Sequence, residues 1–434
     1  MFYKSNFFFW LFFIILPFNI FILNQSTGQE KARKEKSRKS VNLDGVFDGN
    51  EKNHKRHLEE EKKYLNALAK ATIQELLVKL KSDCYIERRD IVLELGRRGK
   101  KAISTLPVLI ELLKNDKSKE VRSAVIHGIV HMGAPAFDAI VYALLHDADW
   151  EVRWAAAWRL GSFHKKAAPI YIIALKKEKK HEVIECIAEL LGSIGPVAVP
   201  ATPDLIEVLK IDFKEDEAYG FPHKIVQFIV AIGPKTFPYI HLAYKKKENG
   251  KIKYYLAKVM LSFGDHCATA IPDLIIALKD KDFKIRYSAA RVLGKIGPKA
   301  EKAVPALIKV SNDKNAKVRY YSTEALGKIG AKAISALPFL IKYLEDQDSN
   351  IRLISASSIG EMGLQASSAI PHLLKLLTDK ENIVKLHVIE ALGKISAHNS
   401  SVLEALHKIA QSSKEVEYVK KSAIEAMKKI ENTK

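Results

Sequence analysis

The chain has 434 residues, of which 47% are hydrophobic, and its 70 Lys and Arg against 50 Asp and Glu give a formal net charge of +20. This length fits two or three ordinary domains or one extended repeat array, and the apolar content is sufficient for a folded core. The three cysteines, Cys84, Cys186 and Cys267, lie far apart with no Cys-x-x-Cys pair, which argues against a disulfide framework and a structural zinc site.

The N-terminal segment is predicted to be a targeting sequence. A lysine precedes the apolar run FFFWLFFIIL at residues 7–16, and small residues fit a cleavage after Gly28. This pattern is typical of a secretory signal peptide. The alternative is an uncleaved anchor that reaches Leu23, although the run is short for a membrane span and the basic KARKEKSRK after it disfavours translocation. We expect residues 1–28 to export the protein, to the periplasm or the extracellular space, or to anchor it in a membrane.

Residues 29–63 are polar and charged and show no sustained apolar period. Such a composition predicts a charged flexible linker. The folded part of the chain is therefore expected to occupy residues 64–434.

A repeated unit follows the linker and is most regular in the C-terminal half. The early units contain IERRDIVLELGRRG, EVRSAVIHGIVHMG and EVRWAAAWRLGSF. Residues 211–250 depart furthest from the pattern, because Pro222 stands where other units have a basic residue. The later units are nearly uniform, and each is marked by a proline 33 residues after the previous one: Pro272, Pro305, Pro338 and Pro371. A fixed period of this length indicates a repeat architecture.

Each unit is predicted to form two helices. Proline suits the first turn of the first helix, where its missing N–H would be unpaired anyway, and Leu and Ile at helical spacing give that helix one apolar face. The second helix ends in paired glycines, such as Gly294 with Gly297, which let the chain leave the helix. Neither helix can bury its face alone, so the units must stack. The sequence thus predicts an all-α fold, an α-solenoid of about eleven helix pairs between Leu65 and Ile430.

An acidic residue stands six residues before a basic one in six units. The pairs are Asp116 and Arg122, Asp147 and Arg153, Asp280 and Arg286, Asp313 and Arg319, Asp346 and Arg352, and Asp379 and Lys385. With these pairs the chain from about Tyr64 onward resembles HEAT-like repeat proteins of the armadillo type, particularly the short repeats of the phycobilisome lyase family. In HEAT repeats such residues form a hydrogen-bonded ladder between units, so the resemblance implies a structural role for all twelve.

Three of the four tryptophans lie on one expected second helix. Numbered from the basic residue of each unit, Trp150, Trp154 and Trp158 form a stripe centred roughly 145° from the buried face. The same columns contain Tyr254, Tyr287, Tyr320 and Arg291 in later units. The resemblance implies that second helices line a concave surface, so we predict that these seven residues bind a partner there. The alternative is that the aromatic stripe belongs to the core.

The sequence offers little support for catalysis. His127 and His131 are spaced to hold a metal on the exposed side of a helix, but no H-E-x-x-H, Gly-rich phosphate loop or G-x-S-x-G is present. The related deoxyhypusine hydroxylases bind iron through several His-Glu dyads, whereas this chain has one, His181 with Glu182. Cys267 occupies a slot that holds Ala in other units, which favours a packed thiol. We expect no catalytic residue, no metal and no cofactor; a lyase-like or hydroxylase-like enzyme, or a subunit of one, stays an alternative.

The net positive charge also fits a solenoid that binds nucleic acid in a basic groove. The export signal argues against this alternative, as does the mixing of Lys and Glu along most helices. The sequence therefore predicts a non-catalytic scaffold or adaptor that binds a protein or peptide in its concave groove, with membrane association only through the N-terminal segment.

Overall fold

The computed structural model describes residues 47–211, 220–246 and 250–432, and within these ranges the secondary structure is helical, without strands. The all-α prediction is therefore confirmed. The predicted targeting segment, residues 1–28, lies outside the described residues. The chain divides after Leu76 into a short N-terminal unit and a long unit from Leu77 to Lys434.

The N-terminal unit contains the helix α3 (Phe47–Lys70) and the start of α4 (Ile73–Lys79). The prediction of a flexible linker is therefore wrong over residues 47–63, which belong to α3. Residues 51–70 contain no Gly or Pro and are rich in Glu, Lys and Leu, which favour a helix even without an apolar period. A capping box begins α4, because the Thr72 N–H donates to Glu75 (2.7 Å) and the Glu75 N–H donates to the Thr72 hydroxyl (3.2 Å).

The helices from α4 onward alternate between first and second helices of the repeated unit, which gives eleven successive pairs among the described residues, as the sequence predicts. The first helices are α4, α6 (Leu106–Asn115), α8 (Phe137–His146), α10 (Ala168–Leu175), α12 (Thr202–Val208), α14 (Phe237–Lys245), α16 (Ile271–Ala277), α18 (Val304–Val310), α20 (Leu337–Tyr343), α22 (Ile370–Leu376) and α24 (Ser400–Gln411). The second helices are α5 (Tyr85–Arg98), α7 (Lys119–Ile129), α9 (Trp150–Leu160), α11 (His181–Ile194), α13 (Phe221–Ile232), α15 (Gly250–Phe263), α17 (Phe283–Ile296), α19 (Ala316–Ile329), α21 (Ser349–Glu361), α23 (Asn382–Ile395) and α25 (Glu417–Asn432).

A short 3₁₀ segment joins most units to the next one. These segments are η1 (Gly99–Thr105), η2 (Val130–Met132), η3 (Ala134–Ala136), η4 (Gly161–Ala167), η5 (Gly195–Ala201), η6 (Pro234–Thr236), η7 (Gly264–Ala270), η8 (Gly297–Ala303), η9 (Gly330–Ala336) and η10 (Gly363–Ala369). Gly330 begins η9 with φ 71°, a backbone conformation that favours glycine. Pro338 then lies in the first turn of α20, where a backbone N–H would have no partner within the helix, so proline costs no hydrogen bond.

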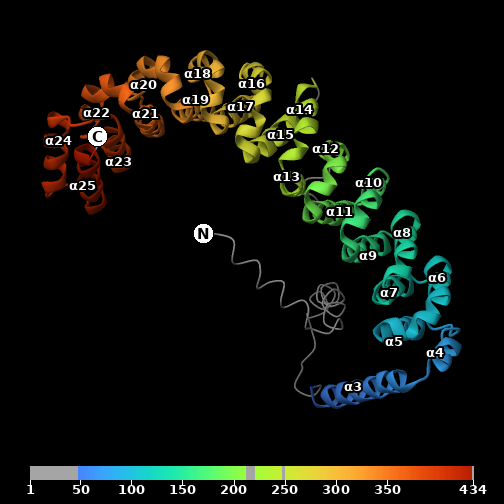
Figure 1. Cartoon of the computed structure of the whole chain (residues 1–434). Coiled ribbons are helices and arrows are strands. Elements are labelled where there is room, and N and C mark those ends of the chain that lie inside the picture. Colours follow the sequence, from blue (N-terminus) through green and yellow to red (C-terminus); the bar gives the residue numbers. More distant parts are fainter. Residues whose placement is uncertain (1–46, 212–219, 247–249, 433–434) are drawn as a thin grey trace, which may run out of the picture. The chain divides into compact units, whose positions relative to one another are not determined.

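The second helices of the long unit stack side by side, and Figure 1 shows them on the inner side of the curved row, with the first helices on the outer side. The stack is tight where glycine faces the next helix: a Cβ added to Gly327 would lie 2.6 Å from the Cα of Ser358. The positions expected to face the core are buried, including Val318 and Leu326 at 0% exposure. The core is thus a continuous layer between the two rows of helices.

Two helical stretches, His181–Val208 and Gly250–Ala277, have the length and apolar composition that a membrane span requires. Each consists of a second helix, a 3₁₀ segment and the next first helix, and the chain turns at Gly195 (φ 71°) and Gly264 (φ 58°). Their apolar side chains contribute Leu191 and Leu256 to the buried core. Length and composition alone therefore give weak support for a span here.

Candidate partner-binding surface

The ladder residues lie in the turns between first and second helices. In each case a basic side chain of one unit forms an ion pair with an acidic side chain of the following unit. The pairs are Arg88 with Asp116 (2.8 Å), Arg122 with Asp147 (2.8 Å), Arg153 with Glu178 (2.7 Å), Arg286 with Asp313 (2.8 Å), Arg352 with Asp379 (2.7 Å) and Lys385 with Glu415 (2.7 Å).

The spacing of six residues has a separate role within each unit. Arg122 donates from Nη1 to the main-chain carbonyl of Asp116 (2.9 Å), six residues earlier, while its Nε donates to Asp147 of the next unit. The Asp116 carboxylate in turn accepts the N–H of Ser118 (2.9 Å). Each guanidinium therefore holds its own turn and links it to the next. Charge-assisted, paired hydrogen bonds of this kind are among the strongest in proteins.

The ladder has a break in the middle of the array. Ile184 in α11 and Pro222 in α13 replace the basic residue. In α15 the position is occupied by Lys253, whose ammonium lies 5.8 Å from the ring centroid of Tyr244. Asp280 accepts the N–H of Asp282 (2.9 Å) but has no ion pair with the preceding unit among the described residues.

Arg319 and Asp346 also remain apart within the part of the chain that the structure describes. Arg319 donates to the carbonyls of Asp313 (3.0 Å) and Lys314 (3.3 Å), and Asp346 accepts the N–H of Asp348 (2.8 Å). These two residues hold their own turns without joining the two units.

The α9 tryptophans lie where the repeat register places them. Trp154 is 37% exposed and Trp158 39% exposed, and their rings stack with centroids 6.1 Å apart and planes within 6°. Trp150 is half-buried, and the Lys180 ammonium lies 5.2 Å from its ring centroid. The opposite side of α9 is buried in the core and contains small side chains such as Ala156. Two exposed, stacked indoles thus form a flat apolar surface, and their binding to a partner stays a prediction.

A second aromatic group, the tyrosine cluster, joins α15, α17 and α19. Its members are Tyr254, Tyr255, Tyr287, Tyr320 and Tyr321. Tyr287 contacts Tyr254 edge-on with ring centroids 6.3 Å apart, and it contacts Tyr321 with centroids 5.6 Å apart. Tyr254 also packs against Tyr255 (5.4 Å), and Tyr320 against Tyr321 (5.2 Å). The predicted Tyr320 therefore joins the cluster through Tyr321, which the register analysis missed because it lies one position outside the column.

Two cations border the tyrosine cluster. The Lys258 ammonium lies 4.8 Å from the ring centroid of Tyr254 and 2.7 Å from Nε2 of His223, to which it donates. The Arg291 guanidinium lies 4.9 Å from the ring centroid of Tyr321. Neither cation forms an ion pair with a carboxylate in the described ranges. Such cation–π contacts hold the two cations in place, and N–H groups that do not face the rings can donate to a ligand.

Burial, hydrogen bonds and the charge of Lys258 shift the pKa values of Tyr254, Tyr287 and His223. Burial raises the pKa of Tyr254, but the hydrogen bond from Tyr287 and the charge of Lys258 outweigh burial and lower this pKa overall. The pKa of Tyr287 is raised by its burial and by its hydrogen bond to Tyr254. Burial and the charge of Lys258 lower the pKa of His223. The charge of Lys258 thus acts on both Tyr254 and His223, and a positive charge at this place favours an anionic group.

The expected exposed pair of His127 and His131 needs a correction. His127 is half-buried, because Arg159 of the next second helix packs over it and donates from Nε to its Nδ1 (2.7 Å). Burial and the charge of Arg159 lower the pKa of His127 to about 3. Neutral and hydrogen-bonded, His127 belongs to the contact between α7 and α9. In the described residues no three His, Cys, Asp or Glu side chains gather as metal ligands.

The other candidate reactive groups are packed or engaged. Cys267 is fully buried, and burial raises its pKa to about 12. His181 and Glu182 contact each other (3.3 Å). These environments match structural roles, since a reactive thiol needs exposure and a low pKa.

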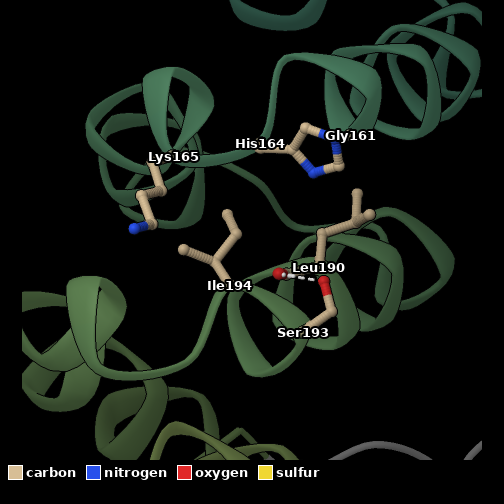
Figure 2. Close-up of a pocket in the computed structure, with 6 residues that line it drawn as sticks. All are labelled: Gly161, His164, Lys165, Leu190, Ser193 and Ile194. Atoms are coloured by element: carbon tan, nitrogen blue, oxygen red, sulfur yellow. Dashed lines mark hydrogen bonds between the residues drawn. The ribbon is translucent and has the colours of Figure 1, made fainter.

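A hollow of about 220 Å³ lies at the end of α9, beside α11 (Figure 2). His164 and Lys165 border it on one side, and Leu190, Ser193 and Ile194 on the other. The Ser193 hydroxyl donates to the Leu190 carbonyl (2.7 Å), as the dashed line in Figure 2 marks. His164 has φ 46° where later units have glycine, so the backbone at this hollow is strained.

The comparisons with known proteins agree with this architecture. A family described as HEAT repeats matches residues 240–315 and 304–393, and the single HEAT repeat matches residues 139–167. No curated protein matches the sequence.

Among solved structures, Kap121p bound to Pho4p is similar at 15% identity and a TM-score of 0.53, with 82% of this chain and 45% of that chain covered. Kap121p bound to RanGTP gives the same values. Importin beta in an ammonium sulfate condition is similar at 12% identity and a TM-score of 0.51, with 82% of this chain and 57% of that chain covered. The chain thus spans about half the length of these proteins, and the likeness shows the fold alone.

The stacked helix pairs define an α-solenoid. Residues 139–167 and 240–393 of it match HEAT repeats. The finer resemblance, to the repeats of the phycobilisome lyase family, stays a prediction.

Proposed function

We propose that this protein is a non-catalytic scaffold or adaptor that holds a protein or extended peptide along the inner side of its solenoid. The observation that carries the proposal is the exposed, stacked pair of Trp154 and Trp158 on α9. Trp and Tyr supply a large contact area for little lost conformational entropy, and they are enriched among the residues that dominate binding energy. The similar solenoid of Kap121p was solved bound to Pho4p, which supports a protein partner.

The test is capture of partners by the full chain, tagged at its C-terminus and cross-linked in its own cells. We expect the Trp154→Ala/Trp158→Ala variant to lose the captured partner. The control is Ile276→Ala/Phe339→Ala, which removes exposed apolar side chains (70% and 44% exposed) from the first helices α16 and α20. Equal capture by the tryptophan variant and the wild type would overturn the proposal. A loss of about 3 kcal/mol or more in the tryptophan variant would instead show that the indoles are core residues.

We further propose that residues 1–28 export the protein or anchor it in a membrane; export would put the solenoid outside the cytoplasm. The apolar run at residues 7–16 supports this. The mass of the mature N-terminus separates the outcomes: cleavage after Gly28 supports export, and an intact chain in the membrane fraction supports an anchor. An intact chain in the cytoplasm would contradict both.

A further inference from the structure

We propose that the tyrosine cluster recognises acidic side chains, Asp or Glu, spaced about three residues apart in an extended polyproline II segment of the partner. This inference rests on the proposed function, because it names the chemistry of the partner at one part of the same surface. Its observations are separate from those at α9: they are the two cations, Lys258 and Arg291, and the phenol rings on which they lie.

Charge complementarity selects an anion. Lys258 and Arg291 lack a carboxylate among the described residues, whereas the ladder residues Arg122, Arg286 and Arg352 each have one. Both are half-buried, so part of their hydration is already lost. A carboxylate would restore the missing hydrogen bonds, and a guanidinium offers it two parallel N–H groups.

The arrangement of the helices sets the spacing. Lys258 lies on α15 and Arg291 on the adjacent α17, and packed helices are about 8–10 Å apart. A polyproline II chain has three residues per turn and advances about 3.1 Å per residue, so side chains three residues apart lie on one face of the chain and reach successive helices. The rings form a contact series from Tyr254, under Lys258, through Tyr287 to Tyr321, under Arg291, and offer an apolar contact to the residues in between.

The surrounding charges favour isolated carboxylates over a continuous polyanion. Glu185 and Glu189 on α11 and Glu324 on α19 occupy the same two columns as the tyrosines and the cations. Glu185 is paired with Lys224 and Glu324 with Lys328, so the carboxylate of Glu189 is the one of these that would repel a nucleic-acid backbone following the row of helices. A peptide can instead place neutral or basic residues opposite Glu189.

The experiment measures fluorescence anisotropy of labelled peptides of about twelve residues, an extended length that spans several helices, with the full chain. The probe has Glu at every third position and Ser and Phe between. Matched peptides replace Glu with Gln, with Lys or with phosphoserine, and single-stranded DNA is the polyanion control. We expect the Glu peptide to bind about tenfold or more tightly than the Gln peptide, with an affinity that falls as salt rises.

Charge reversal supplies the matched variants. Lys258→Glu/Arg291→Glu should lose the Glu peptide and bind the Lys peptide instead, whereas Lys309→Glu/Lys342→Glu, on exposed positions of the first helices α18 and α20, should bind as the wild type does. Equal binding of the Glu and Gln peptides would overturn the inference, as would equal losses in both variants. Binding of only the phosphoserine peptide or the DNA would overturn it in favour of a phosphate ligand.

The two proposals fail separately. If partner capture depends on Trp154 and Trp158 but is unchanged in Lys258→Glu/Arg291→Glu, and the peptide panel shows no acidic preference, the scaffold function stands and the acidic recognition falls. If the Glu peptide binds but no partner is captured, the scaffold function falls while the tyrosine cluster keeps its ligand.

Discussion

The second helices α17 to α25 and the second helices α11 to α15 stack by different means. In the first region, ion pairs join three of the four pairs of consecutive turns. Gly294, Gly327 and Gly360 bring neighbouring helices so close that an added Cβ would lie 2.6 to 2.9 Å from backbone of the next helix. In the second region Ile184 and Pro222 replace the basic ladder residue and Lys253 forms no ion pair among the described residues, while Val230 and Leu261 occupy the glycine position in α13 and α15. The difference shows that the units can stack without ladder pairs, since Lys224 with Glu185 and Lys258 with His223 are the polar links between second helices there.

The largest effect should follow from breaking a ladder pair. Arg352 and Asp379 have side chains only 9% and 8% exposed, so Arg352→Met leaves a buried carboxylate without its partner and should cost about 3 kcal/mol. The matched change Lys253→Met in α15 removes no ion pair and should cost less than about 0.5 kcal/mol. Urea unfolding followed by circular dichroism measures both. Equal losses would show that the two regions do not differ in their polar links.

The glycine contact should give the next largest effect. A Cβ at Gly327 would lie 2.6 Å from the Cα of Ser358, so Gly327→Ala must push α19 and α21 apart and should cost about 2 kcal/mol. At Gly192 in α11 the nearest atoms are 3.3 to 3.4 Å away. The gain in helix propensity offsets this looser contact, so Gly192→Ala should stay within about 0.5 kcal/mol of the wild type. A larger loss at Gly192 than at Gly327 would reverse the comparison.

Hydrogen exchange should distinguish the two regions without any substitution. We expect the amides of α13 to open with a free energy about 1 kcal/mol or more below that of α19, because fewer specific contacts hold α13 to its neighbours. Exchange followed by mass spectrometry of peptides from both helices measures the difference. Uniform protection along the array would mean that the ladder adds nothing to local stability.

Acid should act on the two regions with opposite signs, and this is the smallest effect. Burial raises the pKa of Asp379, but the hydrogen bond from Arg352 outweighs it and lowers the pKa overall, so the stability from this group is present above its unfolded pKa and is lost as the pH falls through the folded value. The pKa of Glu189 is raised by burial and by Glu185, so protonation favours the folded state there.

The test compares Asp379→Asn and Glu189→Gln at about pH 7 and about pH 4. The deficit of Asp379→Asn should narrow in acid, whereas the small gain of Glu189→Gln, under about 0.5 kcal/mol because the side chain is exposed, should vanish. Urea midpoints at the two pH values provide the measurement. A deficit of Asp379→Asn that widens in acid would contradict the assignment.

The repeat, the helix pairs and the exposed tryptophans could be predicted because proline, glycine and apolar periods act within one unit. Contacts between units were harder to predict. Glu178 was missed because Ile184, six residues later, removes the acidic-basic signal, although Glu178 still accepts Arg153 of the preceding unit. His127 was expected to be exposed because the register of one helix does not show that Arg159 of the next second helix packs over it. The helix α3 was missed because its residues favour a helix by propensity alone and lack the apolar period from which the other helices were predicted.

The ladder also makes the array modular. Arg286 pairs with Asp313 and Arg352 with Asp379, in each case 27 residues later in the chain. Removal of residues 320–352, one period of 33, would leave Arg319 followed by Asp379 at that same interval of 27. Shortening or lengthening the solenoid by whole units thus keeps the interval at which a link between turns can form, although Arg319 and Asp346 have the same interval and form no ion pair among the described residues.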